Sequence, residues 1–252
     1  MKMTGFASVV IGFKNFQQLI QSAAAVGDEI QVRIRKDGLK IQQLDQNHYL
    51  MGILELKSEY LRDFSYPFED EICVAIPAHL IKKYKKADTV EIVASPEDSK
   101  IKFFEFYGQL IGEEKLYNVR VVKHFSDLKS DFDAYIQVYI KPLVAILKTA
   151  NYINDHMIFD VNESNVTFST AKERVEFKIS SPQGSDIVYT IDVKRSAKVA
   201  LNNVLLIRIL RALSSIANSA VIKIETNRPA RIEAVSYISP ISAYYYLAPM
   251  SL

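Results

Sequence analysis

Residues 7–26 read ASVVIGFKNFQQLIQSAAAV, a short apolar run followed at once by an amphipathic segment. The apolar run over 7–11 is typical of a buried strand. In the segment after it, apolar side chains recur at spacings of three and four, the period of a half-buried helix. This stripe consists of Phe13, Phe16, Ile20, Ala23 and Ala24. The stretch therefore predicts a strand that leads directly into a helix.

The same pattern occurs four times along the chain. The predicted helices are Gly12–Val26, Pro77–Ala87, Lys141–Ile153 and Asn203–Ala217. These helices start near positions 13, 77, 141 and 203, at intervals of 64, 64 and 62 residues. Each helix follows a short apolar run and precedes alternating segments that are broken by turn residues such as Asp37-Gly38. A regular interval of this kind indicates an internally repeated unit of strand, helix and strand meander.

Four units form two pairs, and the sequence therefore predicts an α+β fold with two similar domains. Each domain is a duplicated unit whose helices pack on one face of mostly antiparallel sheet. We expect an N-terminal domain over 1–119, a connector over 120–133 and a C-terminal domain over 134–252. The connector, RVVKHFSDLKSDFD, alternates charged and isolated apolar residues, as an exposed linker does. Its apolar residues favour a segment that lies against a surface.

Composition indicates a globular protein inside the cell. The chain has 252 residues, of which 49% are hydrophobic, which is ample for a buried core. It has no apolar run long enough to span a membrane and no segment like a signal peptide at its start, so we expect a cytoplasmic or nucleoid location. The single cysteine, Cys73, stands in EICVAI and is expected to be a buried strand residue.

Charge is segregated between the predicted helices and the rest of the chain. The four helices contain no Asp or Glu, while the remaining chain has 22 basic and 29 acidic residues, a balance of −7. The nine helix cations are Lys14, Lys82, Lys83, Lys85, Lys86, Lys141, Lys148, Arg208 and Arg211. A solvated face would explain one such helix, but solvated helices usually mix both signs. Four acid-free helices instead predict a shared surface that faces a polyanion such as DNA or RNA.

The residues expected of an enzyme are missing. The sequence has no phosphate-binding loop, dinucleotide fingerprint, zinc-protease motif or nucleophile elbow, and its four histidines show no metal-ligand spacing. Asp45 and His48 are the nearest candidates for an acid-base pair, but this spacing is more typical of a hydrogen-bonded turn. We therefore expect no catalytic residues, no metal and no cofactor.

Two motifs carry a resemblance to a known family. The segment YYYLAPM, residues 244–250, resembles the Y-Y-L-A-P-[KR] ending of PCNA-type DNA sliding clamps, and DGLKIQQLDQNH, residues 37–48, resembles their segment after the first hairpin. The length, the four units and the mid-chain connector match that family along the whole chain. The resemblance implies the DNA clamp fold, in which three subunits form a ring around duplex DNA with the helices lining the hole.

The resemblance also implies a function in DNA replication and repair without catalysis. The chain would be a processivity factor that tethers polymerase, flap endonuclease and ligase to duplex DNA, independently of DNA sequence. A clamp loader and other clamp subunits are implied as further partners. The residues expected to face DNA are Lys14, Gln18, Lys82, Lys83, Lys86, Lys148, Arg208 and Arg211.

The resemblance also implies a pocket for partner proteins, whose residues in this chain are those at the positions that match the family's pocket. It would receive a short motif of partner enzymes, in which a glutamine is followed by a hydrophobic residue and two aromatic residues. Its residues here would be Leu44, Tyr49, Met51, Val122, Leu128, Pro229, Tyr246, Leu247, Ala248 and Pro249. The alternative is that YYYL is only a core-facing strand, and at least one of its tyrosines must face inward.

The resemblance further implies a subunit contact between two edge strands, over 110–117 and 174–179. Its expected residues are Leu110, Leu116, Tyr117, Val175, Phe177 and Ile179. Two features depart from the family, a net charge of +2 where an acidic chain is usual, and Met250 where a basic residue is common. A homotrimer, a heterotrimer subunit as in some archaea, a checkpoint-type clamp subunit and a basic nucleic-acid-binding protein that forms no ring stay open.

Overall fold

The computed structural model describes residues 5–120, 131–236 and 238–251. The described residues form two compact units. The first holds 5–43, 52–120 and 240–242, and the second holds 44–51, 131–236, 238–239 and 243–251. Residues 121–130 of the predicted connector lie outside the described residues. The segment 44–51 groups with the second unit, which the expected boundaries at 119 and 134 did not include.

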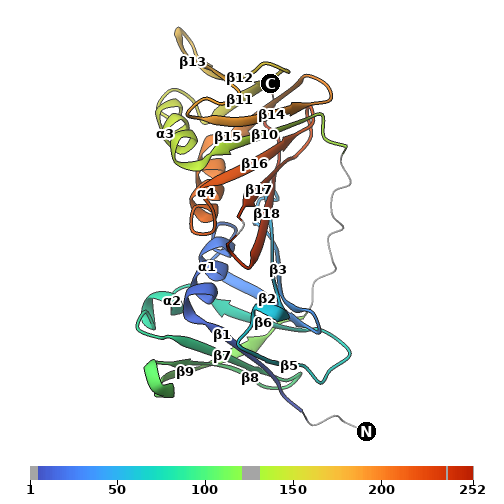
Figure 1. Ribbon diagram of the computed structural model, residues 1–252, viewed down its shortest axis with the longest axis vertical. Helices are drawn as coiled ribbons and strands as arrows, with labels where there is room; N and C mark the ends of the chain where they lie inside the picture. Colours follow the sequence, from blue (N-terminus) through green and yellow to red (C-terminus); the bar gives the residue numbers. More distant parts are fainter. Residues whose placement is uncertain (1–4, 121–130, 237, 252) are drawn as a thin grey trace. The chain divides into compact units, whose positions relative to one another are not determined.

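The first unit is an antiparallel sheet with two helical segments (Figure 1). Its elements are β1 (Ala7–Gly12), α1 (Phe13–Ala23), β2 (Glu29–Arg35), β3 (Gly38–Leu44), β4 (Leu50–Lys57), β5 (Asp63–Ser65), β6 (Ile72–Pro77), α2 (Leu80–Lys83), β7 (Thr89–Ala94), β8 (Ser99–Phe104) and β9 (Leu110–Asn118). Short 3-10 turns follow β4 at Ser58–Tyr60 and β8 at Phe106–Gly108. The strand order is β4-β3-β2-β6-β9-β8-β7-β1-β5.

The second unit repeats the plan with two sheets (Figure 1). Its elements are β10 (Ala134–Tyr139), α3 (Ile140–Ala150), β11 (His156–Val161), β12 (Asn165–Lys172), β13 (Val175–Pro182), β14 (Val188–Val193), β15 (Ala197–Asn202), α4 (Asn203–Leu213), β16 (Ser219–Ile224), β17 (Ala230–Val235) and β18 (Ile241–Leu247). One sheet has the order β14-β10-β16-β17-β18, and the other has the order β13-β12-β11-β15. Helices α3 and α4 pack against each other.

The predicted α+β class and the repeated strand-helix unit are confirmed. Helices α1, α3 and α4 each begin at the residue after a strand ends, and the predicted stripes are buried except for half-buried Ala24. Phe16 and Ile20 of α1 and Leu206 and Leu210 of α4 are almost fully inaccessible to solvent. Burying each such side chain stabilises the fold by roughly 1.5–3 kcal/mol. The apolar stripe, rather than helix propensity alone, therefore holds these helices on their sheets.

The second predicted helix is wrong in length. The structure has a helix only over Leu80–Lys83, not over Pro77–Ala87. Tyr84 leaves the helical conformation, with φ −111° and ψ 36°. Its ring stacks on Phe103 of β8 with a centroid distance of 4.1 Å, and its hydroxyl donates a hydrogen bond to Glu114 of β9. Packing of one aromatic ring against the sheet thus ends the helix after a single turn, which periodicity could not predict.

The turn between β2 and β3 depends on Gly38. This residue has φ +131°, a conformation that only glycine adopts readily. A Cβ at this position would lie 2.3 Å from the carbonyl oxygen of Leu56 and 2.7 Å from the amide nitrogen of Ser58. Both backbone strain and a backbone clash therefore oppose any side chain here.

Gly38→Ala is expected to lower the free energy of unfolding by roughly 3 kcal/mol, since strain and overpacking add. Gly184→Ala is the matched control, because Gly184 has φ +78° but no atom within 4 Å of the position that a Cβ would take. Gly184→Ala is expected to lower the free energy of unfolding by about 1 kcal/mol, because only the strained backbone conformation opposes the added Cβ. Urea unfolding followed by circular dichroism measures both, and equal costs would contradict the clash.

Cys73 is buried in β6, as expected from the sequence. Burial raises the pKa of its thiol to about 11, which the nearby Arg33 partly offsets and Glu71 reinforces. The thiol is therefore protonated at neutral pH, which argues against a reactive cysteine.

At pH 8, Cys73 of the folded chain is expected to react with a water-soluble disulfide reagent at least about 100-fold more slowly than in the unfolded chain, because two pKa units separate the thiolate fractions. Because the unfolded thiol ionises first, stability is also expected to fall as the pH rises from 9.0 to about 11. Stopped-flow absorbance in the presence and absence of urea compares the rates. Similar rates in both states would show an accessible thiol.

Candidate nucleic-acid and partner-binding surfaces

The basic residues of the helical segments are the first candidate binding residues, some in the first unit and some in the second, and we call this set of residues the basic face. All nine cations predicted from the sequence are exposed, whereas most residues of the apolar stripes of the same segments are buried. Among the described residues, only Lys83 of the nine forms an ion pair with a carboxylate. The other eight positive charges are available to a ligand, as a polyanion-binding surface requires.

Lys83 differs from its neighbours. Its ammonium pairs with Glu114 of β9, and this hydrogen bond lowers the pKa of Glu114, with a further contribution from the Tyr84 hydroxyl. The same contact raises the pKa of Lys83. Its charge is thus compensated within the chain, unlike that of Lys82 or Lys86. Gln18, also expected to face DNA, is half-buried on α1.

A cavity of about 400 Å³ extends the basic face beside the start of α1. Lys14 of α1 and Lys85 line it together with Arg62, which lies just before β5. The Arg62 guanidinium donates a hydrogen bond of 3.0 Å to Asp88. Sequence reasoning missed Arg62 because it stands outside the predicted helices, in a segment where both signs of charge alternate.

The C-terminal segment forms the second candidate site, which we call the C-terminal pocket. After β18, the amide of Ala248 donates to the carbonyl oxygen of Tyr49 at 2.9 Å, and the amide of Met250 donates to that of Ala200 at 2.8 Å. These bonds hold the segment across a cavity of about 350 Å³. The lining residues are Tyr49, Asn202, Leu205, Ala248, Pro249, Met250 and Ser251.

The structure brings together three of the ten residues predicted for the partner pocket, namely Tyr49, Ala248 and Pro249. Leu44, Met51 and Pro229 do not line this cavity, and Val122 and Leu128 lie outside the described residues. Asn202 and Leu205 were missed because they stand at the start of α4, about 45 residues before the motif that indicated the site. No motif in the sequence around Asn202 and Leu205 indicated that they belong to the site.

Tyr246 and Leu247 belong to the core rather than to the pocket surface. Tyr246 is only 3% exposed and Leu247 is inaccessible, as is Tyr245. Tyr244 is half-buried, with the Arg231 guanidinium 4.0 Å from its ring centroid. The predicted inward-facing tyrosine is therefore confirmed, and the run of aromatic residues mainly anchors β18. After Leu247, the residues Ala248, Pro249 and Met250 are half-buried.

The segment of Asp45 and His48 is a turn. The Asp45 carboxylate accepts a hydrogen bond of 2.7 Å from the Leu50 amide, and the His48 amide donates to the Asp45 carbonyl oxygen at 3.1 Å. These bonds position Tyr49, whose side chain is 55% exposed at the pocket. The interpretation as a hydrogen-bonded turn is confirmed. In the described part of the chain, no cluster of three or more His, Cys, Asp or Glu side chains could hold a metal ion.

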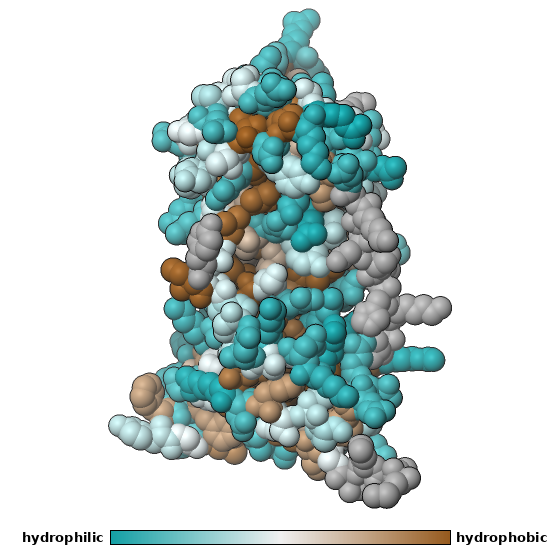
Figure 2. Space-filling view, turned by 45° about the vertical axis from the view of Figure 1, so that its right-hand side comes forward, coloured by the Kyte–Doolittle hydropathy of each residue, from teal (hydrophilic) through white to brown (hydrophobic). Residues whose placement is uncertain are grey.

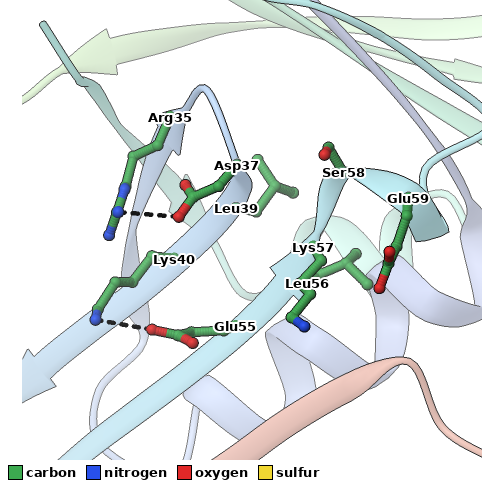
Figure 3. Close-up of a pocket in the computed structure, with 9 residues that line it drawn as sticks. All are labelled: Arg35, Asp37, Leu39, Lys40, Glu55, Leu56, Lys57, Ser58 and Glu59. Carbon is green, nitrogen blue, oxygen red and sulfur yellow. Dashed lines mark hydrogen bonds and ion pairs between the residues drawn. The ribbon is translucent and has the colours of Figure 1, made fainter.

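A further polar cavity, of about 260 Å³, lies at the β2–β3 turn (Figure 3). Its charged groups pair with each other, Arg35 with Asp37 at 3.0 Å and Lys40 with Glu55 at 2.8 Å. Because these charges are compensated within the chain, we assign no binding function to this cavity.

Figure 2 shows one face of the molecule on which hydrophilic residues predominate and hydrophobic residues form separate patches. Of the helices in the described ranges, none has the length and apolar character needed to cross a membrane.

Two strand edges form the third candidate surface. β13 is an edge strand, and β9 pairs with β8 along its length but with β6 only at Tyr117 and Asn118. Of the six residues predicted for the subunit contact, Leu110, Tyr117 and Val175 are exposed, Phe177 and Ile179 are half-buried, and Leu116 is buried. Free edges with exposed apolar residues are typical of strands that pair with another chain.

Comparisons with known proteins agree with this architecture. No protein-family model matches the chain. It is 23% identical to DNA polymerase sliding clamp 1 of Pyrobaculum aerophilum, over 95% of this chain and 96% of that protein. It is also 23% identical to the DNA polymerase sliding clamp of Pyrococcus abyssi, over 90% and 92% of the two chains. The crystal structure of PCNA from Thermococcus kodakaraensis superposes with a TM-score of 0.82 at 17% identity, covering 97% of this chain and all of that one. The fold is therefore that of PCNA, as the two sequence motifs implied.

Proposed function

Since this chain is a PCNA-type DNA sliding clamp, we propose that it forms a ring around duplex DNA and tethers replication and repair enzymes to it. The observation that carries the proposal is the basic face, four helical segments without a carboxylate in a chain that is similar to archaeal sliding clamps over nearly its whole length. Repeated basic segments of this kind present one sign of charge to a ligand that is itself a repeating polyanion.

The contacts with DNA are electrostatic and independent of base sequence. Lysine and arginine side chains on exposed helix faces reach phosphates, whereas base readout needs hydrogen-bonding groups that enter a groove. We assign these contacts to Lys14, Lys82, Lys86, Lys148, Arg208 and Arg211, with Lys85 added at the cavity beside α1. Retention on DNA then follows from encirclement, with weak phosphate contacts in addition. We propose no catalytic step for the chain itself.

The C-terminal pocket is proposed as the receptor for the partner enzymes. Its lining combines Tyr49 and Leu205 with residues 248–250. A cavity with aromatic and aliphatic lining residues can bind the anchor side chains of a peptide. Polymerase, flap endonuclease and ligase are the proposed partners, through a motif with one glutamine, one hydrophobic residue and two aromatic residues.

Ring closure is assigned to the free edges of β9 and β13. Such a contact is head-to-tail. It gives a closed ring, rather than an open filament, only when the rotation from one subunit to the next completes a full turn after a whole number of subunits. A closed ring must be opened for DNA to enter, so a clamp loader is a further proposed partner. The place of action is proposed to be the DNA inside the cell.

Replacing Lys82, Lys86, Arg208 and Arg211 by alanine is expected to weaken DNA retention without changing assembly, because these side chains are exposed and lie outside the strand edges. Each lost phosphate contact should reduce the slope of log K against log salt concentration by about 0.9. Retention on nicked circular DNA, loaded by an archaeal clamp loader with ATP, is measured over a salt series. Light scattering checks the mass.

The matched control replaces Lys172 and Lys198 by alanine, two exposed lysines on β12 and β15 outside the basic face. These changes should leave the salt slope unchanged. Equal lifetimes of the unmodified chain on circular and linear DNA would contradict encirclement and favour an open basic surface.

Tyr49→Ala is expected to weaken binding of a partner peptide by about tenfold or more, because it removes an aromatic wall of the C-terminal pocket. A synthetic peptide with the sequence pattern Q-x-x-L-x-x-F-F is titrated by isothermal calorimetry. Tyr152→Ala is the control, since Tyr152 is 93% exposed in the turn after α3 and does not line the cavity. Equal affinity of Tyr49→Ala and the unmodified chain would exclude this pocket.

A further inference from the structure

The cavity beside the start of α1 combines side chains from three segments of the first unit. Its lining residues come from 12–17, 60–62 and 85–88. The Phe13 amide donates a hydrogen bond of 2.8 Å to the Asp88 carbonyl oxygen. The Arg62 amide donates another, also of 2.8 Å, to the carbonyl oxygen of Val10 in β1. Backbone hydrogen bonds thus join the three segments to each other and to the sheet, so the walls of the cavity are held in place.

The cavity carries an excess of positive charge. Lys14 and Lys85 are exposed in its lining, and among the described residues neither forms an ion pair. The third cation, Arg62, donates a hydrogen bond of 3.0 Å to the Asp88 carboxylate, which also lines the cavity. Because this hydrogen bond lowers the pKa of Asp88, the pair stays ionised at neutral pH and its two charges compensate each other. The two lysines remain, and together they match a phosphomonoester, which carries nearly two negative charges.

Three further lining residues offer groups that bind a nucleobase rather than a phosphate. Tyr60 ends the 3-10 turn after β4 and is 51% exposed. An exposed aromatic ring can stack on any base, because every base has a π-face. Asn15 and Gln17 are half-buried, and in the described part of the chain neither side-chain amide forms a hydrogen bond. Each amide has donors and an acceptor that can pair with the polar edge of a base.

The other polar cavity of the first unit, at the β2–β3 turn, lacks this excess of charge. Its lining has as many acidic as basic residues, and two of its ion pairs are short. The cavity beside α1 therefore differs from it in having uncompensated cations next to an exposed aromatic residue. Its volume of about 400 Å³ lies in the range of small-ligand pockets, roughly 300–1,000 Å³.

We propose that this cavity binds a nucleotide that ends in a phosphomonoester, with Lys14 and Lys85 binding the phosphate and Tyr60 stacking on the base. A free nucleoside monophosphate and the phosphorylated 5′ end of a DNA strand share this chemistry. The site goes beyond the duplex contacts proposed above, because the bases of a duplex are stacked on one another and do not reach an aromatic side chain of the protein. It needs neither a ring nor encircled DNA.

The first measurement titrates deoxyadenosine monophosphate into the purified chain by isothermal calorimetry, at low salt and without DNA. Deoxyadenosine and inorganic phosphate are titrated separately. Because the cavity uses both ends of the nucleotide, each part alone is expected to bind at least about tenfold more weakly than the whole. Equal affinity for inorganic phosphate and for the nucleotide would overturn the proposal and leave a simple anion site. Absence of nucleotide binding up to millimolar concentration would overturn it as well.

Substitutions in the lining test the two roles. Tyr60→Ala is expected to weaken binding of the nucleotide about tenfold, because the base loses its stacking partner, whereas Tyr60→Phe should keep the affinity. Lys14→Ala and Lys85→Ala should each weaken it by a similar factor, since a charged hydrogen bond to the phosphate is lost. Tyr152→Ala and Lys172→Ala are the controls, an exposed tyrosine and an exposed lysine outside the cavity, and should bind as the unmodified chain does. Unchanged affinity of Tyr60→Ala would overturn the proposal.

Two oligonucleotides distinguish the sources of the ligand. A short single strand is added as a competitor of the mononucleotide, once with a 5′ phosphate and once with a 5′ hydroxyl group. Displacement by the phosphorylated strand alone assigns the cavity to strand ends, and displacement by neither strand assigns it to free nucleotides. Equal displacement by both strands would contradict recognition of the terminal phosphate and overturn the proposal.

Tyr60→Ala also separates this site from the sliding-clamp function. Tyr60 is not one of the residues to which duplex contacts are assigned, so the variant should keep the retention of the unmodified chain on circular DNA. Loss of nucleotide binding with unchanged retention is the expected result. An unmodified chain that binds the nucleotide but is not retained on DNA would overturn encirclement and support the cavity.

Discussion

Burial of one apolar stripe per helical segment against an antiparallel sheet is the interaction on which the rest of this structure depends. Because Phe16 of α1 and Leu210 of α4 must face the sheet, the cations on the same helices, Lys14 and Arg211, must face solvent. Because these segments contain no Asp or Glu, their solvent-facing sides carry positive charge without acidic residues. The residues available for binding are those on the side of each helix that does not pack in the core.

The same constraint explains how the C-terminal segment is held in place beside its cavity. Tyr245 and Leu247 are buried and hold β18 in its sheet, so the chain leaves the core at Ala248 in a defined position. Two backbone hydrogen bonds, to Tyr49 and Ala200, then keep the following residues in place beside the cavity. The partner proposed above would meet a segment that is already held in place, which lowers the entropic cost of binding.

Much of the fold could be predicted from the sequence because it depends on periodicity. The stripes at spacings of three and four located three of the four helices to within a few residues at their starts, and the repeat predicted the strand-helix plan. The second helix was overestimated because Tyr84 packs on Phe103 and so ends it, a contact between residues 19 positions apart. Such a contact leaves no periodic signal, since it depends on how β8 passes the helix.

The sequence by itself determined the α+β class, the repeated unit, the separation of charge and the resemblance to PCNA-type sliding clamps, because each of these is a local pattern or a motif. Only the tertiary structure decided which residues share a site. It showed that Asn202 and Leu205 lie in the same cavity lining as Ala248. It also showed that Tyr246 is buried in the core and that Glu114 forms an ion pair with Lys83. These outcomes depend on which strands are neighbours and which way each side chain points, and that information resides in packing between distant segments.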